Sequence, residues 1–331
     1  MKSFNWGIIG PGSIADWFAE ALAPSTRGQL YAVASRNMTK AQTFADKYSA
    51  PMAYGSYQDM LNDDKVDAVY IATPQSLHYQ QAKMCLEAGK HVLIEKPLTI
   101  NAAQSESLIT LSQRKNLLLQ EGLWSRFMPC FEQVQSWLDE DRIGELQYIC
   151  SDIGFAFGHH QGHRLHDPNL GGGALLDLGV YSITLSQYLL QEHPSKISAM
   201  SHFGNRQVDE NTAVTMRYPS GRFSQFTCTI AAQASNTMTL MGSKGRIVLP
   251  YMFWNGNKVI LQQENQQDEV IEFTHRVNGF EYQIEEAMNM IDKKQSCSDF
   301  MPHADSLAVM QTMDEIRRQI GLQFSPEAER V

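Results

Sequence analysis

Three residues of this chain suggest proton and hydride chemistry. Lys96 follows the apolar run His91–Ile94, and Pro97 next to it cannot donate a hydrogen bond to a neighbouring strand. Asp177 and Tyr181 are four residues apart in a segment that predicts a helix, so we expect their side chains on one helical face. Because a tyrosine hydroxyl has an ordinary pKa of about 10, proton transfer near neutral pH requires a neighbouring cation, for which Lys96 is the candidate.

On this interpretation, Tyr181 exchanges the proton of a substrate hydroxyl while a hydride passes to or from a nicotinamide ring. The predicted catalytic residues are Lys96, Tyr181 and Asp177. A structural interpretation is equally open from the spacing alone. Asp177 would then be a first-turn residue that the helix dipole favours, and Tyr181 a core aromatic residue with a satisfied hydroxyl.

A glycine-rich turn near the start of the sequence predicts a dinucleotide site. Gly10-Pro11-Gly12-Ser13-Ile14-Ala15 follows a predicted strand over residues 4–10 and precedes an amphipathic run over residues 16–22, which matches the G-x-G-x-x-A fingerprint. Glycines let the backbone approach a pyrophosphate, and a helix N-terminus offers amide groups to its negative charge. The predicted cofactor contacts are Gly10, Gly12, Ser13 and Ile14.

The end of the second predicted strand, residues 30–34, favours NADP over NAD. An NAD site usually has Asp or Glu at this point to bind the ribose 2′-hydroxyl. This chain has Ser35, Arg36 and Asn37 instead. Arg36 would bind a 2′-phosphate through two N–H groups and Ser35 would add a hydroxyl, so we predict NADP(H) in preference to NAD(H). The alternative is a solvated surface arginine.

Further alternation of strands and helices predicts an α/β Rossmann domain with a parallel, doubly wound sheet. Strands are expected over residues 66–72, 91–94 and 117–120, and helices over residues 76–88 and 101–114. Ligands of such sheets bind beyond the carboxyl ends of the strands. The residues expected there, around the nicotinamide half of the cofactor, are Thr73, Pro74, His78, Glu95, Lys96 and Pro97.

After residue 127 the pattern changes to alternating and β-rich runs, which predict an α+β domain with a large, mainly antiparallel sheet. The expected strands are 146–157, 197–203, 212–218, 223–231, 238–241, 246–249, 259–262 and 269–273, and the expected helices are 128–138 and 305–320. We therefore predict a cofactor domain over residues 1–122 and a substrate domain over residues 123–331, with the final helix able to pack back on the first.

Composition and charge exclude several classes of protein. A length of 331 residues favours two domains, and a net charge of −9 argues against a nucleic-acid partner. The five cysteines are scattered and include no C-x-x-C pair, which is typical of free thiols in a reducing cytosol. No apolar run approaches the roughly 18 residues of a membrane span. We predict a cytoplasmic protein with a small-molecule substrate and no membrane partner.

A histidine-rich loop precedes the triple glycine Gly171–Gly173. It holds His159, His160, His163 and His166, a density that raises the possibility of a metal site. Hydride transfer to a nicotinamide needs no metal, so we predict none. The loop is expected to line the substrate entrance, with Arg164 and Asp167 holding sugar hydroxyls and the glycines giving flexibility.

Several of these motifs together resemble the glucose-fructose oxidoreductase / inositol dehydrogenase / MocA family. The likeness covers essentially the whole chain and is most marked in the branch that contains dimeric dihydrodiol dehydrogenase and NADP-dependent D-xylose dehydrogenase, which has tyrosine at the position of Tyr181. The stretches that carry it are Gly10–Ala15, Glu95-Lys96-Pro97, Glu121–Phe127, Gly171–Tyr181, Ser306–Met310 and Met313–Arg317.

The resemblance implies a Rossmann domain followed by an open sheet that often forms a dimer interface, and hence a homodimer. It implies that Lys96 contacts cofactor and substrate, that Tyr181 is the acid/base and that Asp177 lies close to the reacting hydroxyl. Trp124 and Arg126 are expected near the cofactor. Apolar walls of the substrate pocket are expected at Trp124, Phe155 and Phe280, although aromatic residues in strands or helices are more often core.

The predicted function is an NADP(H)-dependent oxidoreductase that acts on a carbon-bound hydroxyl or carbonyl of a sugar, a polyol or a trans-dihydrodiol. Two alternatives stay open, because the family that the chain resembles includes both. One is a non-catalytic regulatory protein that senses a dinucleotide. The other is a glycosidase that uses bound dinucleotide in a transient oxidation.

Overall fold

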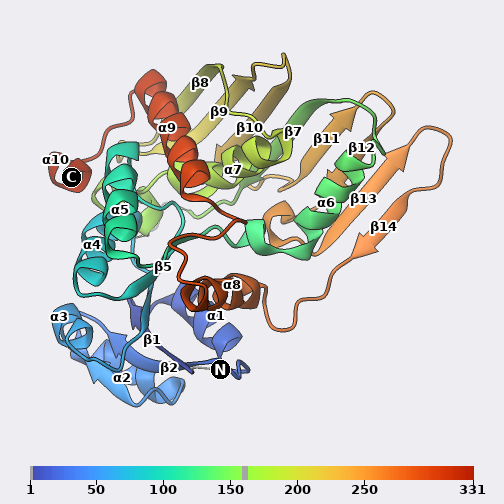
Figure 1. The fold of residues 1–331 in the computed structure, drawn as a ribbon. Coiled ribbons are helices and arrows are strands. Elements are labelled where there is room, and N and C mark those ends of the chain that lie inside the picture. Colours follow the sequence, from blue (N-terminus) through green and yellow to red (C-terminus); the bar gives the residue numbers. More distant parts are fainter. Residues whose placement is uncertain (1–2, 159–162) are drawn as a thin grey trace. The chain divides into compact units, whose positions relative to one another are not determined.

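The computed structural model describes residues 3–158 and 163–331, and the chain divides into two compact units (Figure 1). The first unit comprises residues 1–127, 276–306 and 330–331, and the second comprises residues 128–275 and 307–329. Residues 276–306 thus return to the first unit after residues 128–275 have formed most of the second. The assignment of cofactor binding to residues 1–122 and of substrate binding to residues 123–331 stays a prediction, as does the packing of the final helix.

The first unit contains a six-stranded parallel sheet in the order β3-β2-β1-β4-β5-β6. Its central strands are buried along almost their whole length, which explains why they read as continuous apolar runs. The strand order reverses between β1 and β4, the arrangement of a doubly wound Rossmann fold, and confirms the predicted fold class. The strands are β1 (Phe4–Ile9), β2 (Gly28–Ala34), β3 (Met52–Tyr54), β4 (Ala68–Ile71), β5 (His91–Glu95) and β6 (Leu119–Gly122).

Six helices belong to the first unit among its described residues, and polar side chains cap three of them. Asn37, Ser56 and Asn101 each accept a hydrogen bond from an amide in the first turn that follows. The helices are α1 (Ser13–Leu22), α2 (Met38–Lys47), α3 (Tyr57–Leu61), α4 (His78–Glu87), α5 (Ala102–Lys115) and α8 (Phe280–Asp292).

Helix α8 was missing from the prediction, which had treated Phe280 only as a pocket wall. The residue before the helix is Gly279, with φ of 97°, and it provides no side-chain cap. Glu281 supplies the cap from inside the first turn, because its carboxylate accepts the amides of Val277, Asn278 and Gly279 at 3.0, 3.3 and 2.7 Å. Asn278, which stands directly before Gly279, adds a second acceptor, because its side-chain oxygen accepts the Phe280 amide at 3.1 Å.

The second unit contains an eight-stranded sheet in the order β14-β13-β12-β11-β7-β10-β9-β8. All its neighbouring strands are antiparallel except the β7–β10 pair, so the predicted mainly antiparallel sheet is confirmed. The strands are β7 (Leu146–Gly154), β8 (Lys196–Phe203), β9 (Asp209–Arg217), β10 (Phe223–Thr229), β11 (Met238–Gly242), β12 (Gly245–Leu249), β13 (Lys258–Gln263) and β14 (Glu269–Glu272).

The helices of the second unit include α6 (Pro129–Asp139) and α7 (Val180–Leu190), and residues 307–329 add most of α9 (His303–Ile320) and α10 (Pro326–Glu329). Helices α7 and α9 are joined by a buried hydrogen bond from Gln187 to Thr312 (2.8 Å). Within residues 3–158 and 163–331, no helix combines the length and the apolar character that crossing a membrane requires.

Candidate functional site

The ends of β4 and β5 are tied together beside Lys96. The His78 ring bridges the two segments, since one nitrogen lies 2.9 Å from the Thr73 carbonyl and the other 2.9 Å from the Pro97 carbonyl. The Lys96–Pro97 peptide bond is cis. Four of the residues predicted at the strand ends, Thr73, His78, Lys96 and Pro97, therefore lie in one local cluster, because parallel strands end on the same edge of the sheet.

Two buried carboxyl groups support this cluster. Glu95 accepts a hydrogen bond from the Tyr70 hydroxyl at 2.6 Å. Glu121, at the end of β6, accepts the Leu98 amide at 3.0 Å and the Ser306 hydroxyl at 2.6 Å. Burial raises the pKa of Glu121 to about 7, which the two hydrogen bonds oppose. Glu121 directly follows the strand expected over residues 117–120, but nothing in the sequence indicates its contact with the turn that carries Lys96.

The glycine turn after β1 lies at the reversal of strand order. Gly10 has φ of 88°, and a Cβ there would meet Thr73 Cγ2 at 2.6 Å, so this position requires glycine for packing. A Cβ on Gly12 would meet nothing within 4 Å. Open space at Gly12, next to the uncapped start of α1, fits a pyrophosphate that approaches the backbone closely, with Ser13 and Ile14 at the helix N-terminus.

The end of β2 has the features expected for a phosphate contact. Arg36 is exposed and has no hydrogen-bond or ion-pair partner among the residues that the structure describes. The Ser35 hydroxyl accepts the Asn37 amide at 3.2 Å, and Asn37 in turn caps α2. The turn is thus organised by its own polar groups, which leaves the Arg36 guanidinium available to a ligand.

Trp124 and Phe280 contact each other within the first unit, together with Trp17, which the sequence analysis missed. The ring centroids of Trp124 and Phe280 are 5.1 Å apart, and each lies 5.9 Å from the Trp17 ring. Arg126 is almost fully buried, and each of its two terminal nitrogens donates a hydrogen bond to Oδ2 of Asp305, at 3.0 and 2.9 Å. Asp305 is thus a partner of Arg126 that the sequence did not suggest.

In the second unit, Asp177 and Tyr181 lie on a helical segment whose geometry differs from the prediction. Residues Leu175–Gly179 form a π-helical turn, and α7 begins at Val180. The rule that residues four apart share a face was derived for α-helices, so across this turn it describes the relative direction of the two side chains only approximately. Asp177 does lie in the first turn of this segment, as the structural interpretation expected, but the turn is π-helical. Single π-helical turns within helices occur frequently at functional sites.

Both side chains have close neighbours in their own unit. Asp177 is buried and accepts a hydrogen bond from Arg164 at 3.0 Å, so two of the predicted site residues are paired. The Tyr181 ring is also buried, 5.9 Å from the ring of Trp254. Trp254 in turn lies 5.8 Å from Phe155, the predicted pocket wall. Trp254 sits in a short turn with no motif, which is why the sequence did not single it out.

The predicted entrance loop is only partly described. His159, His160, Gln161 and Gly162 lie outside the described residues. Asp167 accepts the Asn169 amide at 2.9 Å and so caps a short turn. The buried His166 lies 3.1 Å from the Gly158 carbonyl. No group of three or more His, Cys, Asp or Glu in the described part of the chain is placed to hold a metal ion.

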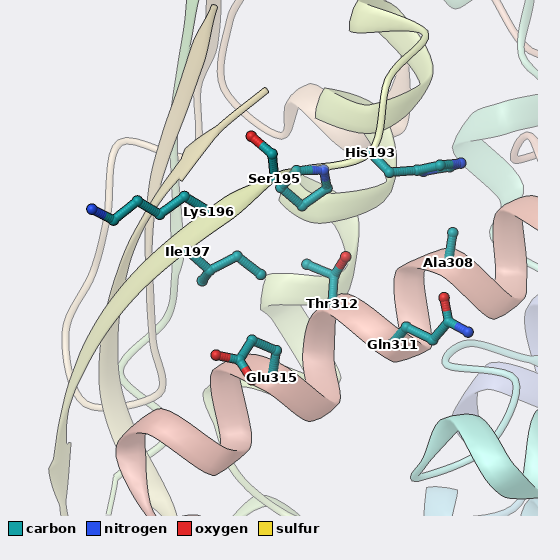
Figure 2. Close-up of a pocket in the computed structure, with 9 residues that line it drawn as sticks. His193, Ser195, Lys196, Ile197, Ala308, Gln311, Thr312 and Glu315 are labelled. Carbon is teal, nitrogen blue, oxygen red and sulfur yellow. The ribbon is translucent and has the colours of Figure 1, made fainter. Parts of the chain in front are cut away.

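Among the described residues, one cavity in each unit lies away from the predicted site residues. One, of about 460 Å³, lies in the second unit between α9 and the segment from α7 to β8, lined by His193, Lys196, Thr312 and Glu315 among others (Figure 2). The other, of about 540 Å³, lies in the first unit between α4 and α5. None of the predicted site residues lines either cavity, so neither serves as the candidate site.

Comparison with known proteins decides the family. A model described as the oxidoreductase family with an NAD-binding Rossmann fold (GFO_IDH_MocA) matches residues 4–123, and the GFO/IDH/MocA C-terminal domain matches residues 131–248. The chain belongs to the Gfo/Idh/MocA family. The predicted family and enzyme class, an NAD(P)-dependent dehydrogenase, are confirmed.

Curated relatives of this Gfo/Idh/MocA protein match it over nearly its full length. Trans-1,2-dihydrobenzene-1,2-diol dehydrogenase of Xenopus tropicalis is 32% identical, over 97% of this chain and 99% of the relative. The enzyme of the same name from Mus musculus is 33% identical, over 97% of this chain and 98% of the relative.

Solved structures agree with this assignment. A 3-ketoreductase of Actinomadura kijaniata in complex with NADP and TDP-benzene has a TM-score of 0.87 and 27% identity, over 96% of this chain and 98% of that one. An aldose-aldose oxidoreductase of Caulobacter crescentus, at 23% identity, covers 96% of this Gfo/Idh/MocA chain and 97% of its own length with a TM-score of 0.87, and shows the shared fold.

Proposed function

We propose that this protein is an NADP(H)-dependent dehydrogenase that oxidises a carbon-bound hydroxyl of a sugar, a polyol or a trans-dihydrodiol, or reduces the matching carbonyl. The observation that carries the proposal is the full-length similarity to trans-dihydrodiol dehydrogenases in a chain with Lys96, Asp177 and Tyr181. A bound nicotinamide dinucleotide would accept or supply the hydride. The protein's own residues then have to hold the substrate and move one proton.

Tyr181 is the proposed proton acceptor during oxidation. Its hydroxyl takes the substrate proton as the hydride leaves the carbon, and returns the proton in the reverse direction. Lys96 orients the substrate hydroxyl and stabilises the tyrosinate form by its positive charge, which favours proton uptake at neutral pH. Asp177, paired with Arg164, shapes the same hydrogen-bond network. Phe155 and Trp254 provide apolar surface beside Tyr181, and Trp124 and Phe280 provide it in the first unit.

The preference for NADP(H) rests on the end of β2. Arg36 is exposed there without a protein partner among the described residues, no carboxylate stands next to it, and Ser35 precedes it. A guanidinium binds a dianionic phosphate with two parallel hydrogen bonds, whereas it gains little from a ribose hydroxyl. Thr73, Pro74, His78, Glu95, Pro97 and Arg126 are proposed to bind or frame the rest of the dinucleotide.

A homodimer and a cytoplasmic location complete the proposal. Met200 in β8 and Phe223 in β10 are 75% and 42% exposed, and apolar side chains on an open sheet often mark a protein interface. Sedimentation equilibrium on the wild type would measure the assembly, and a monomer at micromolar concentration would reject the dimer.

The proposed cytoplasmic location rests on the cysteines. The five cysteines are all free, which suits a reducing compartment.

The first experiment is a fluorescence titration of the purified protein with NADPH and NADH, followed by NADP⁺ with a panel of aldoses, polyols and trans-diols. We expect tighter binding of NADPH, and absorbance growth at the reduced-nicotinamide band for one substrate class. Tight binding without turnover would favour a dinucleotide-sensing regulator. Release of a sugar aglycone without net cofactor change would favour a glycosidase, and no binding of either nucleotide would refute the proposal.

A further inference from the structure

A buried carboxylate holds the start of the segment that carries Asp177 and Tyr181. Asp209, the first residue of β9, has no exposed surface. Its Oδ2 atom accepts hydrogen bonds from the Leu175 amide and the Thr212 hydroxyl, both at 2.8 Å. Leu175 begins the π-helical turn, where the first amides lack an acceptor within the helix. Asp209 therefore caps this turn from a distant strand.

The triple glycine is shaped by this contact. Gly173 has φ of 117°, and a Cβ there would collide with Oδ1 of Asp209. A Cβ on Gly172 would come within 2.6 Å of the Leu165 carbonyl. The Gly172 and Gly173 amides also donate hydrogen bonds, to Asp167 at 3.0 Å and to Leu165 at 2.9 Å. These glycines permit close packing on both sides, a reason that the sequence did not suggest, and the expected flexibility stays a prediction.

The electrostatics of Asp209 argue against a simple stabilising role. Burial raises the pKa of its carboxyl to about 7, against the lowering effect of the Thr212 hydroxyl and the Leu175 amide. A buried ionised group costs free energy that its hydrogen bonds offset only in part. What such a group contributes in return is a defined geometry for the backbone that it binds.

The geometry of this turn sets the directions in which the side chains of Asp177 and Tyr181 project. A π-helical turn holds one more residue than an α-helical turn, so its conversion to an α-helix would rotate residues on its two sides relative to each other by about 100°. Asp177 lies within the turn and Tyr181 lies just beyond it. A change in the turn would thus change how the two side chains are aligned.

We propose that Asp209 is a positioning residue for the proton chemistry of Tyr181, because its bond to the Leu175 amide keeps the π-helical turn and the alignment of Asp177 with Tyr181. This inference rests on the proposed function of Tyr181 as the acid/base. Asp209 acts through the backbone of Leu175 and needs no contact with substrate or cofactor.

The test compares Asp209→Ala, Asp209→Asn and Thr212→Val with Glu192→Gln as the matched control. Glu192 follows the other end of α7 and also accepts a backbone amide, that of Ser220 at 3.0 Å. For Asp209→Ala we expect kcat to fall by about 10- to 100-fold while the NADPH dissociation constant stays within about twofold. Asp209→Asn, which keeps an acceptor for the Leu175 amide, should recover most of kcat, and Glu192→Gln should match the wild type.

Hydrogen exchange of the peptide over residues 173–190 supplies a readout that needs no turnover. We expect faster exchange in residues 175–181 for Asp209→Ala, a smaller change for Thr212→Val and none for Glu192→Gln. An Asp209→Ala enzyme with wild-type kcat and wild-type exchange would refute the inference. Equal losses of kcat and NADPH affinity would also refute it, because they would indicate general damage to the fold.

Failure of this inference can be told apart from failure of the proposed function. If the wild type turns over no substrate of the panel, the proposed function fails, and hydrogen exchange alone judges whether Asp209 holds the turn. If Asp209→Ala does not fold, Asp209→Asn and Thr212→Val decide by the same two readouts. Because Asp209→Asn keeps the acceptor and is expected to resemble the wild type, unchanged exchange over residues 175–181 and unchanged kcat in Thr212→Val would then overturn the role of Asp209.

Discussion

The two units use the same chemical device on very different backbones. In the first unit, Glu121 accepts a backbone amide from Leu98 and a hydroxyl from Ser306. In the second, Asp209 accepts a backbone amide from Leu175 and a hydroxyl from Thr212. Glu121 supports a turn at the regular end of a parallel strand, whereas Asp209 supports a π-helical turn.

The site residues of the two units are therefore held in place by different parts of the fold. In a parallel sheet the strand order already brings the strand ends together, so Gly10, Thr73 and Lys96 follow from local motifs and topology. A π-helical turn has no such frame, and its geometry depends on a tertiary partner. We therefore expect changes at the glycine turn and at the end of β2 to act mainly on dinucleotide affinity, and changes at Lys96, Asp177 and Tyr181 to act mainly on turnover.

The largest expected effect tests the division directly. Tyr181→Phe keeps the ring beside Trp254 and removes only the hydroxyl, so kcat should fall by about 10²- to 10⁴-fold with little change in NADPH affinity. Lys96→Met should abolish turnover to a similar extent and also spare much of the NADPH affinity. Steady-state kinetics and NADPH titration of both variants provide the measurement. An active Lys96→Met enzyme would remove the proposed mechanism.

A matched pair of glycine variants sharpens the comparison inside the first unit. A methyl group on Gly12 enters open space, so Gly12→Ala should leave the melting temperature unchanged and raise the NADPH dissociation constant by about 10- to 100-fold. A methyl group on Gly10 meets Thr73 at a positive φ, so Gly10→Ala should lower the free energy of unfolding by about 1–3 kcal/mol. Calorimetry and NADPH titration separate the two. A destabilised Gly12→Ala would mean that packing, rather than a ligand, explains this glycine.

Much of the fold was predictable because its signals are local. Continuous apolar runs predicted the central strands of the first sheet, because strands buried on both faces are apolar throughout. The alternating pattern predicted the second sheet, because strands buried on one face alternate apolar and polar residues. Helix α8 was not predicted, even though Asn278 and Glu281 both accept amides at its start. The π-helical turn escaped because its residues, Leu175–Gly179, show the same apolar pattern as an α-helix.

Only those residues of the candidate site that belong to a sequence motif were predictable. The dinucleotide turn and the lysine have fixed spacing, so they can be read from the sequence. Asp209, Trp254 and Asp305 lie far along the chain from their partners, at separations of 34 residues for Asp209 to Leu175 and 179 for Asp305 to Arg126. No periodicity links such pairs, because the contacts exist only after the sheets have formed.

A smaller effect is expected at the end of β2. Arg36→Ser should raise the NADPH dissociation constant about tenfold more than that of NADH, because only NADPH loses a charged hydrogen-bond pair. Lys40→Ser, which removes an exposed charge from the following helix α2, is the control for general electrostatics. Titration of both variants with both nucleotides measures the ratio. If Arg36→Ser lowered the affinity for NADPH and for NADH equally, the argument for a preference for NADP(H) would fail.

The smallest expected effect is on the pH dependence of the free energy of unfolding, through the two buried carboxyl groups. Burial raises the pKa of Glu121 and of Asp209 to about 7, from ordinary values of 4.5 and 3.8 in the unfolded chain. Between those values the folded protein binds more protons than the unfolded one, so the free energy of unfolding decreases as pH rises through this window. Below it both states are protonated, and the full contribution to stability is present.

Glu121→Gln and Asp209→Asn should each flatten this decrease, by on the order of 1 kcal/mol between pH 5 and pH 8. Urea unfolding at the two pH values measures it, with Glu192→Gln as a control whose carboxyl has a lowered pKa, caused by its bonds to Ser220 and Arg222 against the effect of burial. If only one variant flattens the profile, the two carboxyl groups are not equivalent. A flattened profile for Asp209→Asn without loss of turnover would show that proton binding at Asp209 and the alignment of Tyr181 are separate properties, since asparagine keeps the acceptor for the Leu175 amide.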